Sequence, residues 1–260
     1  MLKKIYNIFI FFKMNKTKVF SNFKELKWFY KDFKTLKKQL ENNNEFPFGD
    51  WFPVLNEKNS ESGTSKGHYF HQDLLVANKI FINNPKKHVD IGSRVDGFVA
   101  HVASFREIEV FDIRPLNNEI RNIKFIIMDA TKFDNLYSDY TDSISCLHAL
   151  EHFGLGRYGD NIDAFGHIKG FEMINKMLIK GGHFYFSVPI GKQRIEFNAH
   201  RVFNLYYLLN LFKNKYEIAS FSFVDDKGDL QENVELTEKL INENCNCNYG
   251  CGIFDLIKIN

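Results

Sequence analysis

The sequence predicts an α/β fold with a mostly parallel seven-stranded sheet, an antiparallel hairpin at one edge and an N-terminal helical and aromatic extension. Between residues 67 and 224, short apolar runs alternate with segments of helical periodicity. This alternation is typical of a parallel sheet covered by helices on both faces. A glycine-containing loop follows the first apolar run, and two strands end the chain without a clear helical crossover between them, which favours an antiparallel edge.

Residues 1–66 are predicted to form the helical extension and a mobile lid, and residues 67–260 the α/β domain. Apolar residues recur at helical spacing from Phe20 to Leu40, which predicts an amphipathic helix. An extended aromatic segment, Phe46–Pro53, follows. The apolar run at residues 5–12 is shorter than the about 20 residues that span a bilayer, and no small-residue cleavage site follows it. We expect no transmembrane segment there.

Within the domain, we expect strands at residues 87–91, 108–113, 123–128, 142–147, 183–188, 216–224 and 252–259. Helices are predicted at residues 71–81, 163–178 and 202–212, and a further helix begins at Gly97. Gly181 and Gly182 predict a turn before the fifth strand. Asn198 or His200 is a candidate cap for the helix at residues 202–212.

Composition narrows the class of protein. The formal net charge of +2 argues against nucleic acid as a partner. Three of the four cysteines, Cys245, Cys247 and Cys251, crowd near the C-terminus, which is not the spread pattern of a disulfide framework. They also lack a paired C-x-x-C, so we expect reduced thiols and no metal site. The expected location is the cytoplasm, with peripheral contact at the inner face of the membrane as an alternative.

The loop after the first strand reads Asp90-Ile91-Gly92-Ser93-Arg94-Val95-Asp96-Gly97. A dinucleotide fingerprint requires G-x-G-x-x-G, and its middle glycine is missing here. A phosphate-binding P-loop requires Lys and then Ser or Thr after the second glycine, where this chain has Phe98. Both patterns fail, and this favours a cofactor without phosphate groups.

Acidic residues end the next two strands. Asp112, about 20 residues after the loop, is placed to accept hydrogen bonds from ribose hydroxyls. Asp129 ends the third strand, where a carboxylate is able to meet an adenine amino group. Because carboxyl ends of parallel strands share one edge of a sheet, the loop and both acids predict an adenosine-containing cofactor.

These features resemble the class I S-adenosylmethionine-dependent methyltransferases over roughly residues 67–224. The resemblance rests on Asp90–Ser93, Asp112, Asp129–Ala130, Leu150–His152 and the strand Gly181–Pro189. It implies a Rossmann-like fold with S-adenosylmethionine as the cofactor. The family's usual G-x-G is Gly92-Ser93-Arg94 in this chain. The cofactor-binding residues that we expect are Asp90, Gly92, Ser93, Arg94, Gly97, Asp112, Ile113, Arg114, Asp129, Ala130 and His148.

More narrowly, the chain is similar to a bacterial methyltransferase-like family of unknown function that is found near surface-polysaccharide genes. Tyr69, His71 and Gln72 open the helix before the first strand, and in this fold they are further candidates for cofactor contact.

The stretch from His148 to Asp160 has the highest density of side chains able to take part in catalysis or binding. It contains H-x-x-E-H, an inverted zinc-protease pattern. That pattern requires a helix, but it follows a strand here and two glycines interrupt the chain soon afterwards, so we disfavour a protease. In a methyltransferase this stretch and residues 194–203 border the methyl acceptor. Candidate catalytic residues are His152, His200 and Tyr158, and candidate substrate-binding residues are Arg157, Glu196 and Arg201.

The predicted activity is O-methylation of a sugar, sugar phosphate or related anionic precursor of a bacterial surface polysaccharide. His152 or His200 would remove the acceptor proton, and arginines would hold an anionic group. The alternative is a catalytically silent binding module that keeps the fold and acts through a protein partner. A homodimer mediated by the aromatic leader is a further expectation.

Overall fold

The computed structural model describes residues 19–41, 45–55, 57–132 and 135–260. The apolar run at residues 5–12 therefore lies outside the described residues. The chain divides into two compact units, Met1–Thr64 and Ser65–Asn260. Among the described residues, no helix combines the length and apolar character that a membrane span requires.

In the first unit, the predicted helix is present as α2, Val19–Gln39. The aromatic segment that follows it packs against this helix. The ring centroid of Trp51 lies 5.1 Å from that of Phe33 and 5.7 Å from that of Phe29, both edge-on. Phe33 also contacts Phe48 at 5.2 Å. Such edge-to-face pairs suit aromatic quadrupoles, so this small unit is held together largely by rings.

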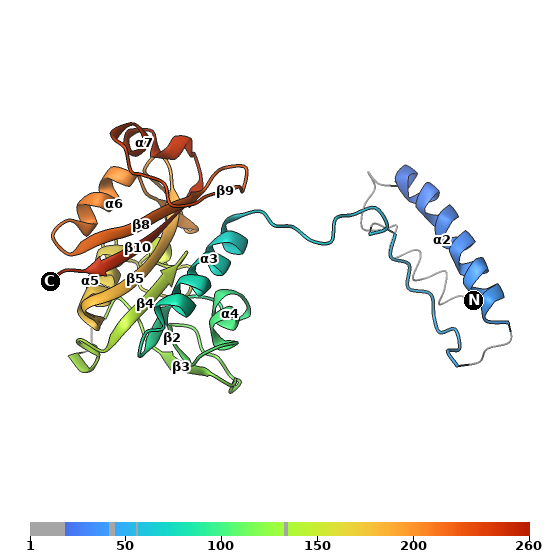
Figure 1. The fold of residues 1–260 in the computed structure, drawn as a ribbon, viewed down its shortest axis with the longest axis horizontal. Helices are drawn as coiled ribbons and strands as arrows, with labels where there is room; N and C mark the ends of the chain where they lie inside the picture. Colours follow the sequence, from blue (N-terminus) through green and yellow to red (C-terminus); the bar gives the residue numbers. More distant parts are fainter. Residues whose placement is uncertain (1–18, 42–44, 56, 133–134) are drawn as a thin grey trace. The chain divides into compact units, whose positions relative to one another are not determined.

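The second unit is an α/β fold whose sheet has the order β3-β2-β1-β4-β5-β10-β8-β9 (Figure 1). Strands β1 to β5 are parallel to one another, whereas β10 is antiparallel to both β5 and β8. The predicted fold class is thereby confirmed, and the two-residue β9 makes an eighth strand. The strand bounds are β1 His88–Ile91, β2 Ile108–Asp112, β3 Ile123–Ile127, β4 Thr141–Leu147, β5 Leu178–Ile190, β8 Tyr216–Val224, β9 Leu230–Gln231 and β10 Gly250–Lys258.

The strand order reverses at β1. Asp90 pairs with Val110 of β2 on one side and with Ser145 of β4 on the other. The chain leaves β1 toward β2 and β3 and later returns to place β4 on the opposite side of β1. Connections diverge at such a point, so a crevice opens beyond the carboxyl ends of the two central strands.

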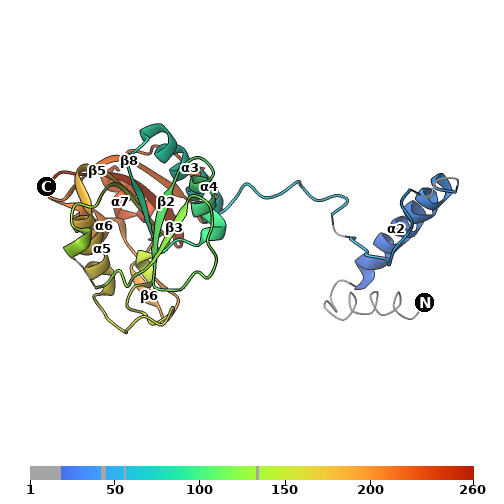
Figure 2. The ribbon, with the colours of Figure 1, turned by 90° about the horizontal axis from the view of Figure 1, so that it is seen from below.

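Helices cover both faces of this sheet (Figure 2). α3 (His68–Asn83) and α4 (Ala100–Ala103) lie on one face, and α5 (Gly166–Met177) and α6 (Leu205–Phe212) on the other. Shorter elements are the π-helical turn η2 (Val95–Val99), the 3₁₀ turns η3 (Asn135–Tyr137), η4 (Leu150–His152) and η5 (Asn244–Asn246), α7 (Glu238–Asn242), and the separate hairpin of β6 (Arg194–Glu196) and β7 (His200–Val202).

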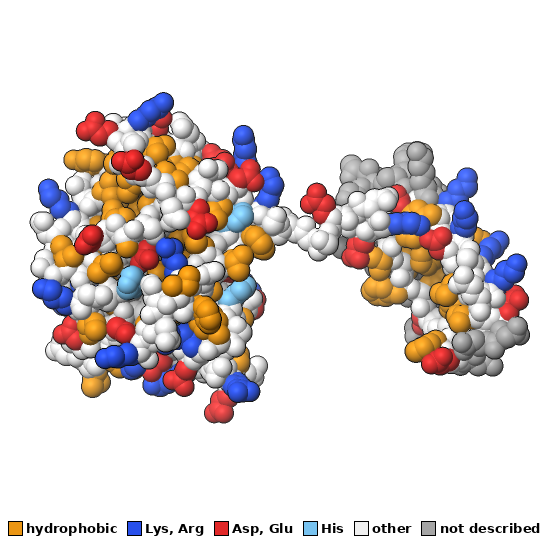
Figure 3. All heavy atoms as spheres, in the orientation of Figure 1, with side chains coloured by type: hydrophobic (Ala, Val, Ile, Leu, Met, Phe, Trp, Pro, Cys, Tyr) orange, Lys and Arg blue, Asp and Glu red, His pale blue; other side chains and the backbone are white. Residues whose placement is uncertain are grey.

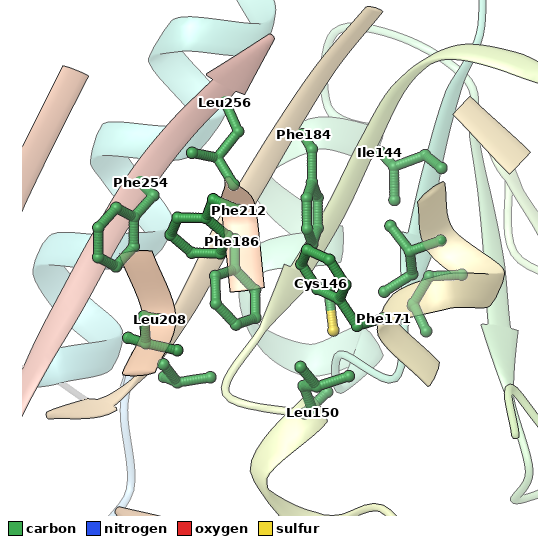
Figure 4. Packing of buried hydrophobic residues seen from close by; sticks show 14 of the residues in the cluster. Ile144, Cys146, Leu150, Phe171, Phe184, Phe186, Leu208, Phe212, Phe254 and Leu256 are labelled. Atoms are coloured by element: carbon green, nitrogen blue, oxygen red, sulfur yellow. The ribbon is translucent and has the colours of Figure 1, made fainter. Parts of the chain in front are cut away.

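Each face has its own buried cluster. Val76 and Ile80 of α3 pack with Val102 of α4 in one cluster. On the other face, Phe171 of α5 and Phe212 of α6 pack against strand residues that include Phe186 and Phe254 (Figure 4). The many phenylalanines of this sequence thus form much of the core under α5 and α6.

Three local predictions were wrong. The helix expected at residues 202–212 begins at Leu205, because residues 200–202 pair in β7 and the side chain of Asn204 caps the helix by accepting from the Tyr207 amide at 2.7 Å. Neither Asn198 nor His200 is the cap. The turn expected at Gly181 and Gly182 lies within β5, which begins at Leu178. It takes the form of an irregularity, because Leu178 pairs with Thr141 and His183 with Ser143, and Gly181 has φ +77°. A Cβ at Gly182 would lie 2.9 Å from the Asp142 carbonyl oxygen, so glycine here permits close strand approach.

Charged side chains of both signs are interspersed over the face of the second unit that Figure 3 shows. This pattern agrees with the formal net charge of +2. A mixed surface of this kind produces no extended single-sign field on the face shown.

We expect Phe254→Ala to lower the free energy of unfolding by about 3–5 kcal/mol, as large-to-small core substitutions do. The Phe254 side chain is 1% exposed and its ring lies 4.8 Å from that of Phe221. The matched control is Phe165→Ala, because Phe165 is 67% exposed, and we expect it to stay within about 0.5 kcal/mol of the parent. Equilibrium urea unfolding measures both, and equal losses would contradict this packing.

Candidate active site

A cavity of about 430 Å³ lies at the carboxyl ends of β1 to β4, a volume usual for small-molecule sites. Its wall combines the loop after β1 with residues that follow β2, β3 and β4. Most of the residues singled out from the sequence meet here. They are Gly92, Ser93, Arg94, Gly97, Asp112, Ile113, Arg114, Asp129, Ala130, His148, His152, Arg157 and Tyr158.

Asp90 does not belong to the cavity wall, and the structure gives it a different role from the predicted contact with the cofactor. Its side chain is fully buried beneath the loop. The carboxylate accepts from the Ser93 amide and hydroxyl, both at 2.9 Å, and from the Ser145 hydroxyl at 2.6 Å. Burial raises the pKa of Asp90 to about 7 against the opposing effect of these hydrogen bonds. Asp90 therefore joins the loop to β4.

Glycine is required where the loop leaves β1. Gly92 has φ +81°, and a Cβ there would lie 2.8 Å from the Cβ of Ala149. Arg94, two residues after Gly92, forms a bidentate pair with Asp96 at 2.6 and 2.9 Å. The side chains of this pair are 74% and 63% exposed. Arg94 therefore lies at the rim and does not fill the cavity.

Asp112 ends β2 with its side chain only 6% exposed. One carboxylate oxygen accepts from the Arg114 amide at 2.8 Å and from Arg114 Nε at 2.9 Å. The other accepts from Arg114 Nη2. The guanidinium also lies 4.4 Å from the centroid of the Tyr158 ring. Asp112 and Arg114 thus form an ion pair in the cavity wall, and the Arg114 guanidinium makes a cation–π contact with the Tyr158 ring.

Asp129 follows β3 and lines the same cavity. Its Oδ1 accepts from the Thr131 hydroxyl at 2.7 Å and from the Thr131 amide at 3.0 Å. Burial raises the pKa of Asp129, but the bonds from Thr131 and the nearby Lys132 outweigh it and hold that pKa below its usual value. Asp129 is therefore an ionised acceptor at neutral pH.

After β4 the chain places Glu151 between two histidines. Nδ1 of His148 lies 2.8 Å from Glu151 Oε1, and Nε2 of His152 lies 3.8 Å from the same oxygen. His148 has φ +49° and precedes the 3₁₀ turn of Leu150–His152. The zinc-protease pattern requires its two histidines to lie on one α-helix. The H-x-x-E-H residues of this chain are not on an α-helix, so they do not meet that requirement.

His152 is oriented by a backbone carbonyl. Its Nδ1 lies 2.6 Å from the carbonyl oxygen of Ala199. Because a carbonyl only accepts, Nδ1 carries the proton and Nε2 keeps its lone pair. Burial lowers the pKa of His152 and outweighs the opposing effect of Glu151. His152 is thus neutral and basic at Nε2 at neutral pH, with Tyr158 edge-on at 5.5 Å.

The segment that carries Arg157 and Tyr158 is folded around Asp160. This carboxylate accepts from the amides of Gly154 at 2.8 Å, Gly156 at 3.2 Å and Tyr158 at 3.2 Å. Arg157 donates to the Ala199 carbonyl at 3.0 Å. Asp160 therefore fixes the backbone of a loop that contains Gly154 and Gly156, residues with unusual conformational freedom.

Besides Asp90, three residues predicted for the methyl-acceptor site lie outside the cavity wall. Arg201 is 5% exposed and donates to the carbonyls of Phe153 at 2.7 Å and Glu151 at 3.3 Å. Its guanidinium is used within the protein, so the structure does not bring it to the predicted acceptor position. Glu196 and His200 lie on the β6–β7 hairpin, 3.0 Å apart, and the ring of His200 is 6.5 Å from that of His152. They flank the cavity without lining it.

Sequence reasoning missed Asp73, a buried acid of α3 that lines the cavity. Gln72 donates to it at 2.9 Å, and a Cβ at Gly97 would lie 3.2 Å from its Oδ2. Burial raises the pKa of Asp73. The only signal in the sequence is an acid in a helix that precedes the first strand, and this signal is weak. Of the three earlier candidates, Tyr69 and Gln72 line the cavity, whereas His71 does not.

The pH dependence of stability tests the role of Asp90. Its folded pKa is raised, so between about pH 4 and pH 7 the unfolded chain loses a proton that the folded chain retains, and stability falls as pH rises. The difference between 3.8 and about 7 sets an upper limit of roughly 4 kcal/mol. We therefore expect Asp90→Asn to gain stability relative to the parent across this window, measured by urea unfolding at several pH values.

The control is Asp129→Asn. Because the folded pKa of Asp129 is lowered, its contribution is lost only as pH falls through that value. The difference in the free energy of unfolding between Asp129→Asn and the parent should stay constant above about pH 5. A constant difference for Asp90→Asn as well would contradict the role of Asp90.

Solved structures share this fold at low sequence identity. A Burkholderia thailandensis 1,6-didemethyltoxoflavin-N1-methyltransferase, with bound 1,6-didemethyltoxoflavin and S-adenosylhomocysteine, aligns with a TM-score of 0.52 at 12% identity and covers 73% of this chain and 79% of that one. The [4+2]-cyclase SpnF gives 0.52 at 12% identity over 73% and 81%. The N-methyltransferase NodS from Bradyrhizobium japonicum WM9 gives 0.50 at 10% identity over 76% and 100%. These likenesses establish the fold alone.

No curated protein matches the sequence significantly. A family model matches residues 95–250, from the end of the glycine loop to the start of β10. Its description is "Caenorhabditis protein of unknown function, DUF268", which assigns neither an activity nor a link to polysaccharides. The chain, an α/β protein with the class I methyltransferase fold, belongs to the DUF268 family.

Proposed function

We propose that this chain is an S-adenosylmethionine-dependent methyltransferase. The observation that carries the proposal is one cavity in which the glycine loop after β1 meets the Asp112 carboxylate at the end of β2 and the Asp129 carboxylate after β3. In this fold, ligands bind beyond the carboxyl ends of the strands at the point where the order reverses. A structural neighbour with the same fold contains S-adenosylhomocysteine, which supports this choice of cofactor.

The residues present fit an adenosine without phosphates. The Asp112 carboxylate is a buried acceptor for ribose hydroxyls, and the Asp129 carboxylate is an ionised acceptor for an adenine amino group. Ile113 and Met128, which are next to these two acids in the sequence, supply apolar surface to the cavity wall. Arg94, the cation of the loop, is already paired with Asp96. The loop therefore lacks an unpaired cation for a phosphate, as the proposal requires.

S-adenosylmethionine, when bound, supplies a methyl group on a sulfonium. Transfer to a hydroxyl forms an oxygen–carbon bond and breaks the sulfur–carbon bond, so the acceptor proton must leave. Nε2 of His152 is suited to take it, because the Ala199 carbonyl holds the proton on Nδ1. Tyr158 packs against His152 and fixes one side of the acceptor space. Most of the rate enhancement would come from positioning.

The charges at the cavity support an anionic methyl acceptor. Arg157 and the Asp112-paired Arg114 both lie near the Tyr158 ring, at 5.1 and 4.4 Å from its centroid, and Arg157 donates to the backbone carbonyl of Ala199. Guanidinium groups bind phosphate and carboxylate through paired donors. We therefore propose O-methylation of an anionic sugar, such as a sugar phosphate. A role in surface polysaccharide rests on the sequence resemblance alone.

A second candidate is a catalytically silent module that binds the cofactor or a protein partner without turnover. The observation that favours it is that both oxygens of Asp112 already accept from Arg114. Ribose binding then has to share or displace these bonds. Cofactor binding without methyl transfer to any member of a panel of sugar phosphates and nucleotide sugars would favour this module.

Cofactor binding is tested by calorimetry with S-adenosylhomocysteine and S-adenosylmethionine. We expect saturable one-to-one binding to the parent, and Asp112→Asn to weaken it by about 10- to 100-fold, because a hydrogen bond to a charged group contributes roughly 1.5–3 kcal/mol. The matched control is Glu107→Gln, an exposed acid just before β2 at the opposite end of the strand. It should bind like the parent. An absence of binding to the parent would refute the proposed function.

The two candidate bases are separated by comparing His152→Gln with His200→Gln. We expect His152→Gln to lower methyl transfer by about 10²- to 10⁴-fold, the usual contribution of a general base, with cofactor affinity unchanged. His200→Gln should lose less than about tenfold, because His200 does not line the cavity. Release of S-adenosylhomocysteine against the sugar-phosphate panel measures both. A larger loss in His200→Gln would reverse the assignment.

A further inference from the structure

We propose that His68, His148 and Cys251 form a binding site for a divalent metal ion of the zinc class. One nitrogen of each histidine and the cysteine sulfur all lie within 4.8 Å of one another. The proposal concerns a different ligand from the cofactor and does not depend on the proposed function.

The three side chains come from three separate elements of the second unit. His68 is the first residue of α3, His148 follows β4, and Cys251 lies within β10. Cys251 is fully buried and pairs with Pro189 of β5 and Val224 of β8. The thiol therefore lies at a fixed position in the sheet, and the two imidazoles approach it from the ends of neighbouring elements.

His148 supplies an independent sign of a missing partner. Its side chain is 4% exposed, and its Nε2 is buried without a hydrogen bond of ordinary geometry, although the Cys251 thiol interacts with the ring. Its other nitrogen, Nδ1, is 2.8 Å from Glu151 Oε1. Buried polar atoms are rarely left unpaired. A carboxylate on one ring nitrogen and a metal on the other is the usual arrangement for a zinc-bound histidine, because the carboxylate fixes the tautomer and the ring orientation.

The donor set suits zinc. Two imidazole nitrogens and one thiolate are ligands that Zn²⁺ prefers, and three protein ligands leave one tetrahedral position open. Ligand atoms around tetrahedral Zn²⁺ are about 3.3–3.6 Å apart, so the 4.8 Å limit of the cluster requires a contraction of about 1 Å. The ring of His68 stacks on His148 at an interplanar angle of 5°. Since a metal lies in the plane of each ligating ring, the partly exposed His68 must turn.

This site adjoins the cofactor cavity. His148 belongs to the cavity wall, and its partner Glu151 also lies 3.8 Å from His152. A metal bound here would tie the start of α3 to the loop after β4 and to β10. It would thereby fix the position of the histidine segment that follows β4, and we assign it this positioning role.

The experiment uses the purified full-length chain, reduced and freed of metal with a chelator. Zn²⁺ is titrated by calorimetry, and bound metal is counted by mass spectrometry of the native protein. We expect one Zn²⁺ per chain. Co²⁺ in its place should give the absorption of a tetrahedral ion together with a thiolate-to-cobalt charge-transfer band. That spectrum needs no variant, so it tests the proposal even where a substitution impairs folding.

Cys251→Ser and His68→Ala should each weaken Zn²⁺ binding by more than about 100-fold, and Glu151→Gln by about 10- to 100-fold. The matched control is Cys247→Ser, a buried thiol four residues away that is not part of the cluster, and it should bind like the parent. Thermal unfolding followed by circular dichroism verifies that each variant is folded.

Four results would overturn the proposal. They are no Zn²⁺ bound to the parent, Co²⁺ bound without the thiolate band, binding that survives Cys251→Ser, and binding lost instead in Cys247→Ser. Binding of Cu²⁺ alone would overturn the zinc assignment, since two imidazoles and a thiolate also suit copper. Cofactor binding is measured separately, so failure here leaves the methyltransferase proposal intact, and the reverse also holds.

Discussion

The buried carboxylate of Asp90 connects the parts on which the site depends. It lies in β1, where the strand order reverses, and it accepts hydrogen bonds from Ser93 in the loop and from Ser145 in β4. A polar group buried this deeply is tolerated only when its hydrogen bonds are satisfied. The loop after β1 and the start of the segment after β4 are therefore held at a fixed separation, and the cavity lies between them.

A second carboxylate, that of Asp160, fixes the loop of residues 154–160 in the cavity wall. Asp160 accepts hydrogen bonds from the amides of Gly154, Gly156 and Tyr158, and the Tyr158 ring lies near both Arg114 and Arg157. The buried Arg201 supports the same region by donating to backbone carbonyls. Both charged groups form hydrogen bonds with the backbone, and they fix the shape of a loop that contains Gly154, Gly156 and Gly159. Asp160 and Arg201 therefore stabilise the backbone, whereas Arg157 is the charged group proposed to bind the acceptor.

His148 links the cavity to the proposed metal site, because it lines the first and belongs to the second. Glu151 lies between His148 and His152 and contacts both. A change at one histidine is therefore transmitted to the other through a single buried carboxylate, for which water screening is weak. The arrangement offers a physical route by which metal occupancy would affect the proposed base.

The sequence by itself determined the order of strands and helices, the position of the cavity and most of its wall, because these depend on local periodicity and on which residues end parallel strands. Gly92, Asp112 and Asp129 were found this way. The tertiary structure decided which polar groups face inward or outward. In the structure Arg94 lies at the rim of the cavity, and Arg201 and Asp90 form hydrogen bonds within the protein. Asp73 of α3 lines the cavity although the sequence did not single it out. The tertiary structure alone brought together His68, His148 and Cys251, since their separation along the chain exceeds any local pattern and only packing defines their distance.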